Sequence, residues 1–444
     1  MEGSTETTSR NDQNKQGRLK SLKNTLYLSL IVGYAVYYYN RKSFTSLIPA
    51  LLHSQNLGES GLGFISSCFA FSYGLSKFGS GILSDRLQPR ELFVAGLIAT
   101  GICNIFFTFF NGVLLLSCVW FVNGLVQGLA WPQCAKLLKI WFEPSEIGTY
   151  WSLLTVGCNI MAGICPLITI YITSNYRWQY AMLLPGLLAI SFSPLTYMMI
   201  YNSRQEARLD GNNTVDNTTV KRKTPKHAWS EILLQLLGSP FLWVLLHGDF
   251  LTAVLKNGIS DWLQLFLIHD KKLSQSTAGY AVTFFEIGGL LGSFLVGVVT
   301  DKWMQKQNPA ESASPRMPAF IWLNAVLLVC LHFLRTVVDS SSSTLFIGIL
   351  LFGCGMALTG GTALYGLLAM ENGPPGYSGT THAIVALGSS LGGVVAGYPM
   401  ATFGKKCGWD QTFFLFQIMA ALNLLVHIWT RNLNKNMVDL NKMD

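Results

Sequence analysis

The chain has 444 residues, of which 50% are hydrophobic and only 12% carry a charge, and its formal net charge is +8. Soluble domains carry about 25% charged residues, so this composition argues against a soluble enzyme, a disordered chain or a nucleic-acid-binding protein. The basic residues are scattered between apolar runs, and the mean hydropathy of +0.37 indicates a protein that fills a membrane.

Twelve apolar runs follow a polar N-terminal segment at 1–24, and each is long enough to cross a bilayer. The first half is predicted at 25–201, with helices near 25–51, 61–84, 91–110, 112–135, 147–174 and 178–201. A polar linker at 202–237 precedes a second half at 238–430, with helices near 238–268, 276–300, 317–337, 343–370, 377–403 and 410–430. A tail covers 431–444. The predicted fold class is therefore an all-α membrane protein.

The distribution of Lys and Arg predicts the orientation of the chain. With the N-terminus in the cytoplasm, 21 of the 31 basic residues fall on the cytoplasmic side and six on the opposite side, as the positive-inside rule requires. Both termini and the linker are therefore predicted to be cytoplasmic. The nine cysteines lie mostly within apolar runs, without a CxxC spacing. We interpret them as small core residues rather than disulfides or metal ligands.

The two halves repeat each other. The motif GILSDR at 81–86 returns as GVVTDK at 297–302, an offset of 216 residues, and Arg41 and Lys256 are 215 residues apart. The two cations therefore fall at one depth in symmetry-related helices. A parallel repeat of six plus six helices is typical of the major facilitator fold, in which the binding site lies between pseudo-symmetric halves near the middle of the membrane.

The repeated motif predicts gating residues in the loops that follow the second and eighth helices. A carboxylate there can cap a neighbouring helix or pair with a cation, and so hold one side of the protein closed. We expect this role for Asp85, Arg86, Arg90, Asp301 and Lys302. The alternative interpretation is ordinary positive-inside charge at a helix end.

Three cations interrupt the apolar runs. Arg41 and Lys42 lie deep in the first helix, and Lys256 lies deep in the seventh. A charge in the hydrocarbon region costs at least ~2.5–3.5 kcal/mol, so such residues mark functional sites. Arg presents a forked pair of donors to an oxyanion, and Lys presents a point charge. Two such groups on the axis between the halves predict the binding of a phosphate dianion.

Further charges within helices need partners. Lys77, Asp261 and Glu286 lie in helices two, seven and eight. Pairs between Lys42 and Asp261, and between Lys77 and Glu286, would join the halves in one conformation and break in the other, which predicts a gating role. Local pairing within one half is an equal alternative. Asp249, seven residues before Lys256 and on the same helix face, either tempers that charge or faces a wet vestibule.

Several motifs resemble the organophosphate:phosphate antiporters of the major facilitator superfamily, from about residue 25 to about residue 430. They are YNRKSF at 39–44, LGFISS at 62–67, SKF at 76–78, WFVNGLVQG at 120–128, WFEPS at 141–145 and THAIVAL at 381–387. Within this family they are most similar to the glucose-6-phosphate transporters of the endoplasmic reticulum.

This resemblance implies roles for individual residues. Arg41 matches the family's phosphate-binding arginine, and Lys256 matches its helix-seven cation. His382 is similar to a subgroup feature that donates to phosphate or to sugar hydroxyls; without the resemblance, a satisfied core histidine is the preferred interpretation. A histidine of bacterial members is Cys158 here, which leaves no imidazole at that position. Together with Lys42, the expected substrate site is completed by Tyr34, Tyr38, Tyr73, Gln127 and Trp131.

The sequence therefore predicts an antiporter, not an enzyme, that exchanges glucose 6-phosphate for inorganic phosphate across the endoplasmic reticulum membrane without a cofactor. Its expected partners are these two small molecules and the lipid bilayer, with no nucleic acid, and the resemblance implies functional coupling to a luminal glucose-6-phosphatase. Two alternatives stay open: exchange of glycerol 3-phosphate or another organic phosphate, and proton-coupled symport through Asp249 or Glu286. A membrane phosphatase or acyltransferase would need a cluster of nucleophile and acid that we do not find, and a substrate sensor is the weakest alternative.

Overall fold

Every apolar run of the sequence forms a helix in the computed structural model. The structure describes residues 2–55, 57–86, 88–142, 144–204, 206–207, 229–306, 313–374, 378–435 and 437. Within the helices, side chains are described except at 2–16, 53–55, 77–86, 144–149, 151–153, 229–232, 305–306 and 378–379. Apolar stretches of this length favour helices because a helix satisfies its own backbone hydrogen bonds inside a bilayer.

The first half contains seven of the described helices. In chain order they are α1 (Glu2–Gln55), α2 (Gly58–Arg86), α3 (Pro89–Phe107), α4 (Val113–Gly128), α5 (Ala130–Trp141), α6 (Pro144–Asn175) and α7 (Gln179–Met199). A break at Leu129 divides α4 from α5, which together make one span. α1 begins well before the predicted boundary at residue 25, so the polar start of the chain continues the first helix.

The second half follows a short helix that the sequence analysis missed, α8 (Trp229–Gly238), which lies inside the predicted linker. The half consists of α9 (Pro240–Leu265) with a π-helical turn at Phe266–Asp270, α10 (Gln275–Lys306), α11 (Met317–Thr336), α12 (Thr344–Glu371), α13 (Ser378–Ala396), α14 (Tyr398–Cys407) and α15 (Trp409–Thr430). A break at Gly397 divides α13 from α14 within one span.

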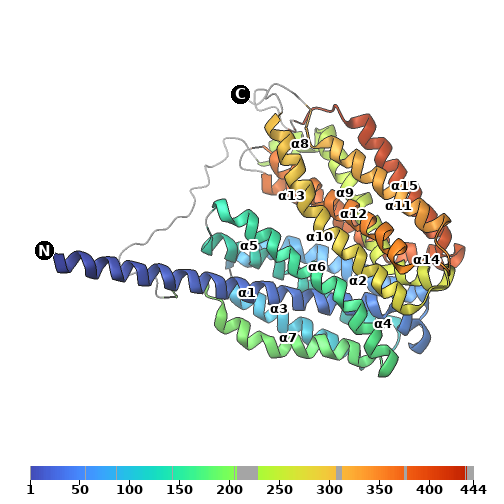
Figure 1. Ribbon diagram of the computed structural model, residues 1–444, viewed down its shortest axis with the longest axis horizontal. Helices are drawn as coiled ribbons and strands as arrows, with labels where there is room; N and C mark the ends of the chain where they lie inside the picture. The colour runs from blue at the N-terminus through green and yellow to red at the C-terminus, as the bar shows by residue number, and fades with distance from the viewer. Residues whose placement is uncertain are drawn as a thin grey trace.

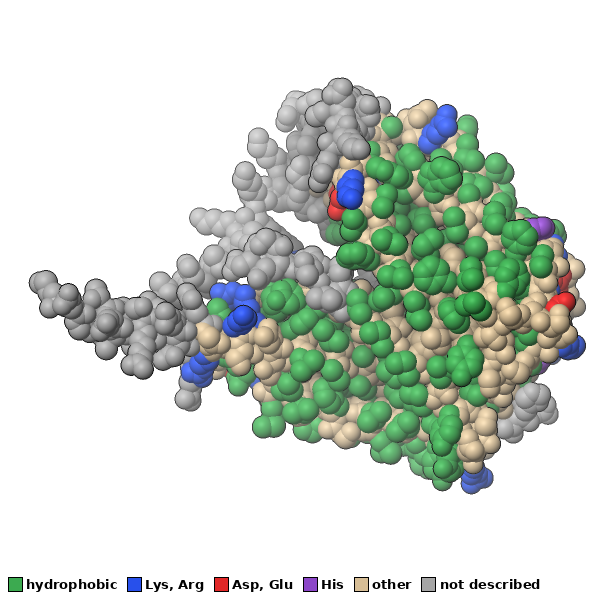
Figure 2. Space-filling view, viewed as in Figure 1, with side chains coloured by type: hydrophobic (Ala, Val, Ile, Leu, Met, Phe, Trp, Pro, Cys, Tyr) green, Lys and Arg blue, Asp and Glu red, His purple; other side chains and the backbone are tan. Residues whose placement is uncertain are grey.

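The outer surface is apolar. Within the described part of the chain, nine spans are long and apolar enough to cross a membrane. The remaining long helices are α1, α2 and α9. Charged residues within them, such as Arg41 in α1 and Lys256 in α9, lower the hydropathy of α1 and α9. Figure 2 shows a broad hydrophobic face with charged side chains mainly near its edges, and side chains such as Trp429 and Leu114 are exposed on the surface. The chain is therefore an all-α membrane protein, as the sequence predicted.

The two halves use the same helix pairs. α2 packs along α4 and α1 along α6, just as α10 packs along α12 and α9 along α13. Small residues allow this close approach: a Cβ on Gly128 would collide with Ser76, and one on Gly292 would collide with the backbone of Met356. Such packing is typical of membrane helices. Figure 1 shows α3 and α7 at one edge of the bundle and α11 and α15 at the opposite edge.

The halves meet at the end where α1 ends and α2 begins, which we call the closed end. Trp409 Nε1 donates to Glu59 Oε1 at 3.1 Å, and the Ser67 hydroxyl donates to a backbone carbonyl of α13 at 2.7 Å. A Cβ on Gly63 would collide with the backbone of Gly397. The described hydrogen bonds between the halves all lie between the middle of the bundle and this end. These contacts join the two halves at the closed end.

Candidate functional site

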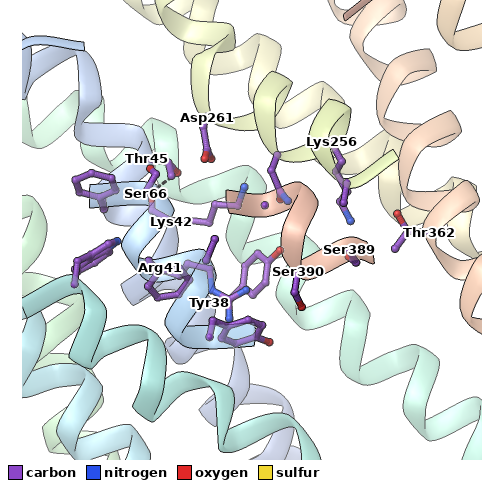
Figure 3. Close-up of a pocket in the computed structure, with 18 residues that line it drawn as sticks. Tyr38, Arg41, Lys42, Thr45, Ser66, Lys256, Asp261, Thr362, Ser389 and Ser390 are labelled. Atoms are coloured by element: carbon purple, nitrogen blue, oxygen red, sulfur yellow. Dashed lines mark hydrogen bonds between the residues drawn. The ribbon is translucent and has the colours of Figure 1, made fainter. Parts of the chain in front are cut away.

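A cavity between the two halves collects several of the predicted site residues (Figure 3). Its volume is about 290 Å³, close to the lower end of the ~300–1,000 Å³ common for small-molecule sites. Its charged lining residues are Arg41, Lys42, Lys256 and Asp261, and three cations less one carboxylate give a formal charge of +2. This charge favours an anionic ligand. The neutral lining residues are Tyr38, Phe44, Thr45, Ser66, Phe69, Ala70, Tyr73, Trp120, Ala253, Asn257, Thr362, Ser389, Ser390 and Gly393.

Arg41 is held by aromatic rings and by an amide. The centre of its guanidinium lies 4.3 Å from the ring centroid of Tyr73 and 5.2 Å from those of Tyr38 and Phe69. Its Nε donates to Gln127 Oε1 at 3.2 Å. Cation–π contacts and a hydrogen bond restrict the orientation of the guanidinium. Since the group has five N–H donors, it keeps donors for an oxyanion.

Lys42 joins the two halves. Its Nζ lies 3.2 Å from Glu286 Oε1 and donates to Ser260 Oγ at 2.5 Å, and both side chains of the ion pair are nearly enclosed, at 12% and 6% exposed. In this structure the partner of Lys42 is Glu286, and the expected pairing with Asp261 in one conformation stays a prediction. α10, which carries Glu286, packs against α6 beside α1 and so brings this carboxylate to Lys42, whereas Asp261 lines the cavity. The side chain of Lys77, the expected partner of Glu286, lies outside the described residues.

The second half contributes the other wall of the cavity. Lys256 and Asn257 lie in the middle of α9, Thr362 lies in α12, and Ser389 and Ser390 lie in α13. Figure 3 places Lys256, Thr362 and the two serines on one side, across from Arg41 and Tyr38 on α1. This wall therefore presents the ammonium group of Lys256 and the carboxylate of Asp261, together with small hydroxyls and an amide.

Four residues expected to bind substrate lie outside this lining. Gln127 is 1% exposed and accepts the hydrogen bond from Arg41. Tyr34 is buried, and its ring centroid is 4.8 Å from that of Trp131, so these two rings pack against each other. His382 is exposed on α13, with its ring next to Gly366 of α12. The substrate contacts of these four residues stay predictions.

The gating motif of the second half forms a cluster within that half. Arg316 is 4% exposed, donates to Asp301 at 2.7 Å and donates to both carboxylate oxygens of Glu371 at 2.7 and 2.9 Å. Burial alone would lower the pKa of Arg316, but the hydrogen bonds that it donates to the two carboxylates outweigh this effect, and the pKa is raised. The cluster joins α10, α11 and α12, whereas Lys302 is exposed.

The corresponding region of the first half is described in part. Arg90, at the start of α3, forms ion pairs with Glu206 at 2.6 Å and with Glu91 at 3.1 Å. These contacts tie α3 to the segment after α7. The side chains of Asp85 and Arg86 lie outside the described residues, and their gating role stays a prediction.

The sequence analysis missed the neutral residues of the second-half wall. Asn257, Thr362, Ser389 and Ser390 are residue types that membrane helices often carry, so composition alone does not single them out. One signal was available: Asn257 directly follows the deep cation Lys256. The serines could be found only from the docking of α13 against the other helices of the site.

Comparison with known proteins identifies a family pattern and several relatives that cover most of the chain. The sequence pattern of the Major Facilitator Superfamily matches residues 30–397. A "Probable hexose phosphate transport protein" of Chlamydia pneumoniae is 32% identical over 425 residues, which cover 92% of this chain and 90% of that protein. The "Membrane sensor protein UhpC" of Escherichia coli is 28% identical and covers 92% of each chain. The "Glycerol-3-phosphate transporter" of Bacillus subtilis is 27% identical and covers 96% of each chain.

The fold also matches a solved structure. It is the crystal structure of a bacterial homolog of the human lysosomal transporter Spinster, in an inward-facing and unoccupied conformation. The TM-score is 0.71, the sequence identity is 12%, and the match covers 92% of this chain and 97% of that one. At this identity the likeness concerns the fold alone.

Proposed function

This chain belongs to the Major Facilitator Superfamily, and we propose that it exchanges glucose 6-phosphate for inorganic phosphate across a membrane. The charge of the cavity carries the proposal. Arg41 and Lys256 line it from opposite halves, and the ion pairs of the described residues involve neither of them. Buried charge requires compensation, so these two cations favour a ligand that brings about two negative charges. A phosphate group at neutral pH carries between one and two.

The shared group of the two proposed ligands supports exchange. Inorganic phosphate and a sugar phosphate present the same oxyanion to Arg41, which grips two oxygens with its fork, and to Lys256, which adds a point charge. An empty cavity with two such cations resists occlusion because their repulsion is uncompensated. Either ligand relieves that repulsion, so the protein reorients when loaded with one or the other.

The neutral part of the second-half wall suits a sugar. Asn257, Thr362, Ser389 and Ser390 offer an amide and three hydroxyls, groups that both donate and accept hydrogen bonds. Sugar hydroxyls need such partners, and a wall of this kind binds them without adding charge. When inorganic phosphate is bound, water would form the hydrogen bonds of these residues.

Alternating access uses the ion pair between Lys42 and Glu286. The pair connects α1 with α10 and lies beside the cavity. Opening of the closed end separates the halves, so it must break this pair together with the contacts of Glu59 and Ser67. Bound phosphate can take the place of Glu286 as the counter-ion of Lys42. Substrate binding then lowers the cost of separating the halves.

The orientation and location of the protein belong to the same proposal. The excess of basic residues supports a cytoplasmic location for the end where α1 begins, and in this orientation the closed end would face the lumen. The motif resemblance supports residence in the endoplasmic reticulum, where coupling to a luminal glucose-6-phosphatase would consume the imported sugar phosphate.

The test is uptake into proteoliposomes loaded with phosphate. Labelled glucose 6-phosphate should enter only when phosphate is inside, and free glucose should not enter. Arg41→Ala should abolish uptake, whereas Arg335→Ala, which removes an arginine that pairs with Asp410 outside the cavity, should retain it. Uptake of glucose 6-phosphate that is independent of internal phosphate would contradict exchange.

Two rival functions have a specific basis. The relatives named as a glycerol-3-phosphate transporter and as a membrane sensor favour another organic phosphate or a sensing role. A preference for glycerol 3-phosphate in the same assay would identify the first. Saturable binding of glucose 6-phosphate by purified protein without any uptake would identify the second. Uptake driven by a pH gradient alone would indicate proton-coupled symport.

A further inference from the structure

Three buried amides connect Arg41 to the backbone of its own helix. Gln127 and Asn123 lie one turn apart on α4, Asn104 lies on α3, and all three are 0–1% exposed. Arg41 Nε donates to Gln127 Oε1 at 3.2 Å, and Gln127 Nε2 donates to Asn123 Oδ1 at 2.9 Å. Asn123 Nδ2 donates to Asn104 Oδ1 at 3.0 Å. Asn104 Nδ2 donates to the carbonyl of Asn40, the neighbour of Arg41, at 3.2 Å. We call this series the amide relay.

Both ends of the amide relay determine the direction of every amide in it. Arg41 has only donors, so Gln127 must present its oxygen to the guanidinium. The carbonyl of Asn40 only accepts, so Asn104 must present its NH₂ group to that carbonyl. Asn123 then has one orientation that satisfies both neighbours. Aligned hydrogen bonds polarise one another, and each amide therefore strengthens the acceptor that faces Arg41.

We propose that Asn123 and Asn104 are positioning residues for Arg41. They orient Gln127, which in turn sets the position and direction of the guanidinium at the cavity. Because the amide relay returns to Asn40, it fixes the Arg41 side chain relative to its own backbone through α4 and α3. This inference rests on the proposed function, in which Arg41 binds the phosphate group of both ligands.

The second half contains a comparable amide network that does not reach its cation. Asn423 Nδ2 donates to Asn324 Oδ1 at 3.1 Å and lies 3.5 Å from the Tyr365 hydroxyl, which contacts His427 Nε2 at 3.1 Å. This network joins α11, α12 and α15, and Asn423 Nδ2 also donates to Thr252 Oγ1 of α9 at 3.4 Å, but none of the hydrogen bonds described for these residues involves Lys256. Asn324, 6% exposed, is therefore a matched control for a buried amide with a packing role alone.

The experiment measures exchange by the full-length protein in proteoliposomes, with KM and turnover determined separately for phosphate and for glucose 6-phosphate. Asn123→Leu interrupts the amide relay between Gln127 and Asn104. We expect both KM values to rise by the same factor, roughly tenfold for the loss of an orienting contact to a charged group, with turnover nearly unchanged. Asn123→Asp has almost the native size and still accepts from Gln127, but it has no N–H group for Asn104, so it should also raise both KM values.

A double variant tests whether the amides act in series. Gln127→Leu combined with Asn123→Leu should raise KM no further than Gln127→Leu alone, because the first change already separates Arg41 from the rest of the amide relay. The control Asn324→Leu should lower thermal stability to a similar extent and leave both KM values unchanged.

Wild-type KM values in both Asn123→Leu and Asn123→Asp would overturn the inference, as would an equal KM increase in Asn324→Leu. If Asn123→Leu does not fold, Asn123→Asp decides alone. Absence of phosphate exchange by the wild-type protein would instead contradict the proposed function. Stabilisation of the purified variants by inorganic phosphate against heat then tests the amide relay: unchanged stabilisation in Asn123→Asp overturns it.

Discussion

The two walls of the cavity hold their cations in different ways. In the first half, Arg41 is surrounded by the rings of Tyr38, Phe69 and Tyr73 and is backed by the amide relay through Gln127. In the second half, Lys256 stands beside small hydroxyls and an amide, and the buried network of that half contacts α9 at Thr252 without a described hydrogen bond to Lys256. The repeat of the two halves therefore does not extend to the residues that surround Arg41 and Lys256.

This difference suggests a division of labour. A guanidinium that is contacted on several sides would hold the phosphate group of each proposed ligand in one position. An ammonium on a flexible stem can follow the ligand, and neutral hydroxyls can bind a sugar or water. The asymmetry would let one cavity accept two ligands of different size with the same phosphate position.

The largest expected effect concerns the fixed cation. Arg41→Ala should reduce exchange of both ligands by at least ~30-fold, since removal of one partner of a buried charge contact costs about 2–5 kcal/mol. Arg41→Lys should recover little because the fork and its contact with Gln127 are lost. Lys256→Arg should be much milder, because the charge remains. Initial rates of phosphate–phosphate exchange in proteoliposomes give the comparison, and near-normal rates in Arg41→Ala would contradict the assigned site.

The next largest effect concerns the ion pair between Lys42 and Glu286, which joins the two halves. Lys42→Ala and Glu286→Ala remove an ion pair that joins the halves, so we expect turnover to fall by roughly 5–150-fold, the range of typical conformational coupling energies, with a smaller change in ligand affinity. The charge-swapped variant Lys42→Glu with Glu286→Lys should recover part of the turnover. Loss of affinity with unchanged turnover would place the pair in the binding site instead.

A third effect tests the seal at the closed end. Gly63→Val overpacks the contact with the opposite half by about 1–3 kcal/mol and should shift the protein toward a state open at this end. Labelling of Ala70→Cys by a membrane-impermeant reagent from the closed side should become faster, in a background without the exposed Cys118 and Cys407. Gly297→Val is the control because no atom lies within 4 Å of its new Cβ. Equal labelling rates in both variants would argue against the seal.

The smallest effect concerns the sugar end. Ser390→Ala should raise the KM for glucose 6-phosphate by about 2–10-fold, as expected for one neutral hydrogen bond of about 0.5–1.5 kcal/mol, and leave the KM for phosphate unchanged. Ser191→Ala, an exposed serine on α7, is the control. A parallel change for both ligands would show that the second-half wall does not distinguish them.

The sequence was sufficient for the fold and for the cations because both depend on local composition. Twelve apolar runs predict membrane helices, and a charge such as Arg41 or Lys256 inside a run is conspicuous because of its cost in hydrocarbon. The helices that the prediction missed or merged have weaker signals. α8 has only ten residues, too few to cross a membrane, and directly follows a polar stretch, and the break at Leu129 occurs at a residue that favours helices.

The pairings could not be predicted because they depend on how helices dock. Which carboxylate reaches Lys42 is decided by the position of α10 against α6, and no spacing in the sequence encodes it. The amide relay has one signal in the sequence. Asn104 and Asn123 are polar residues in apolar helices, and buried polar residues need hydrogen-bond partners. Their connection to Arg41 emerges only when α3 and α4 are placed beside α1.

The contacts at the closed end affect how easily ions could leak through the protein. At Gly63 and Gly397 the two halves touch through backbone atoms, with Ser67 and Ala401 as the small side chains nearby. At this point the contact does not depend on the rotamer of a long side chain, unlike the neighbouring contact between Trp409 and Glu59. Backbone contact of this kind would limit the leak of ions across a membrane that carries a voltage.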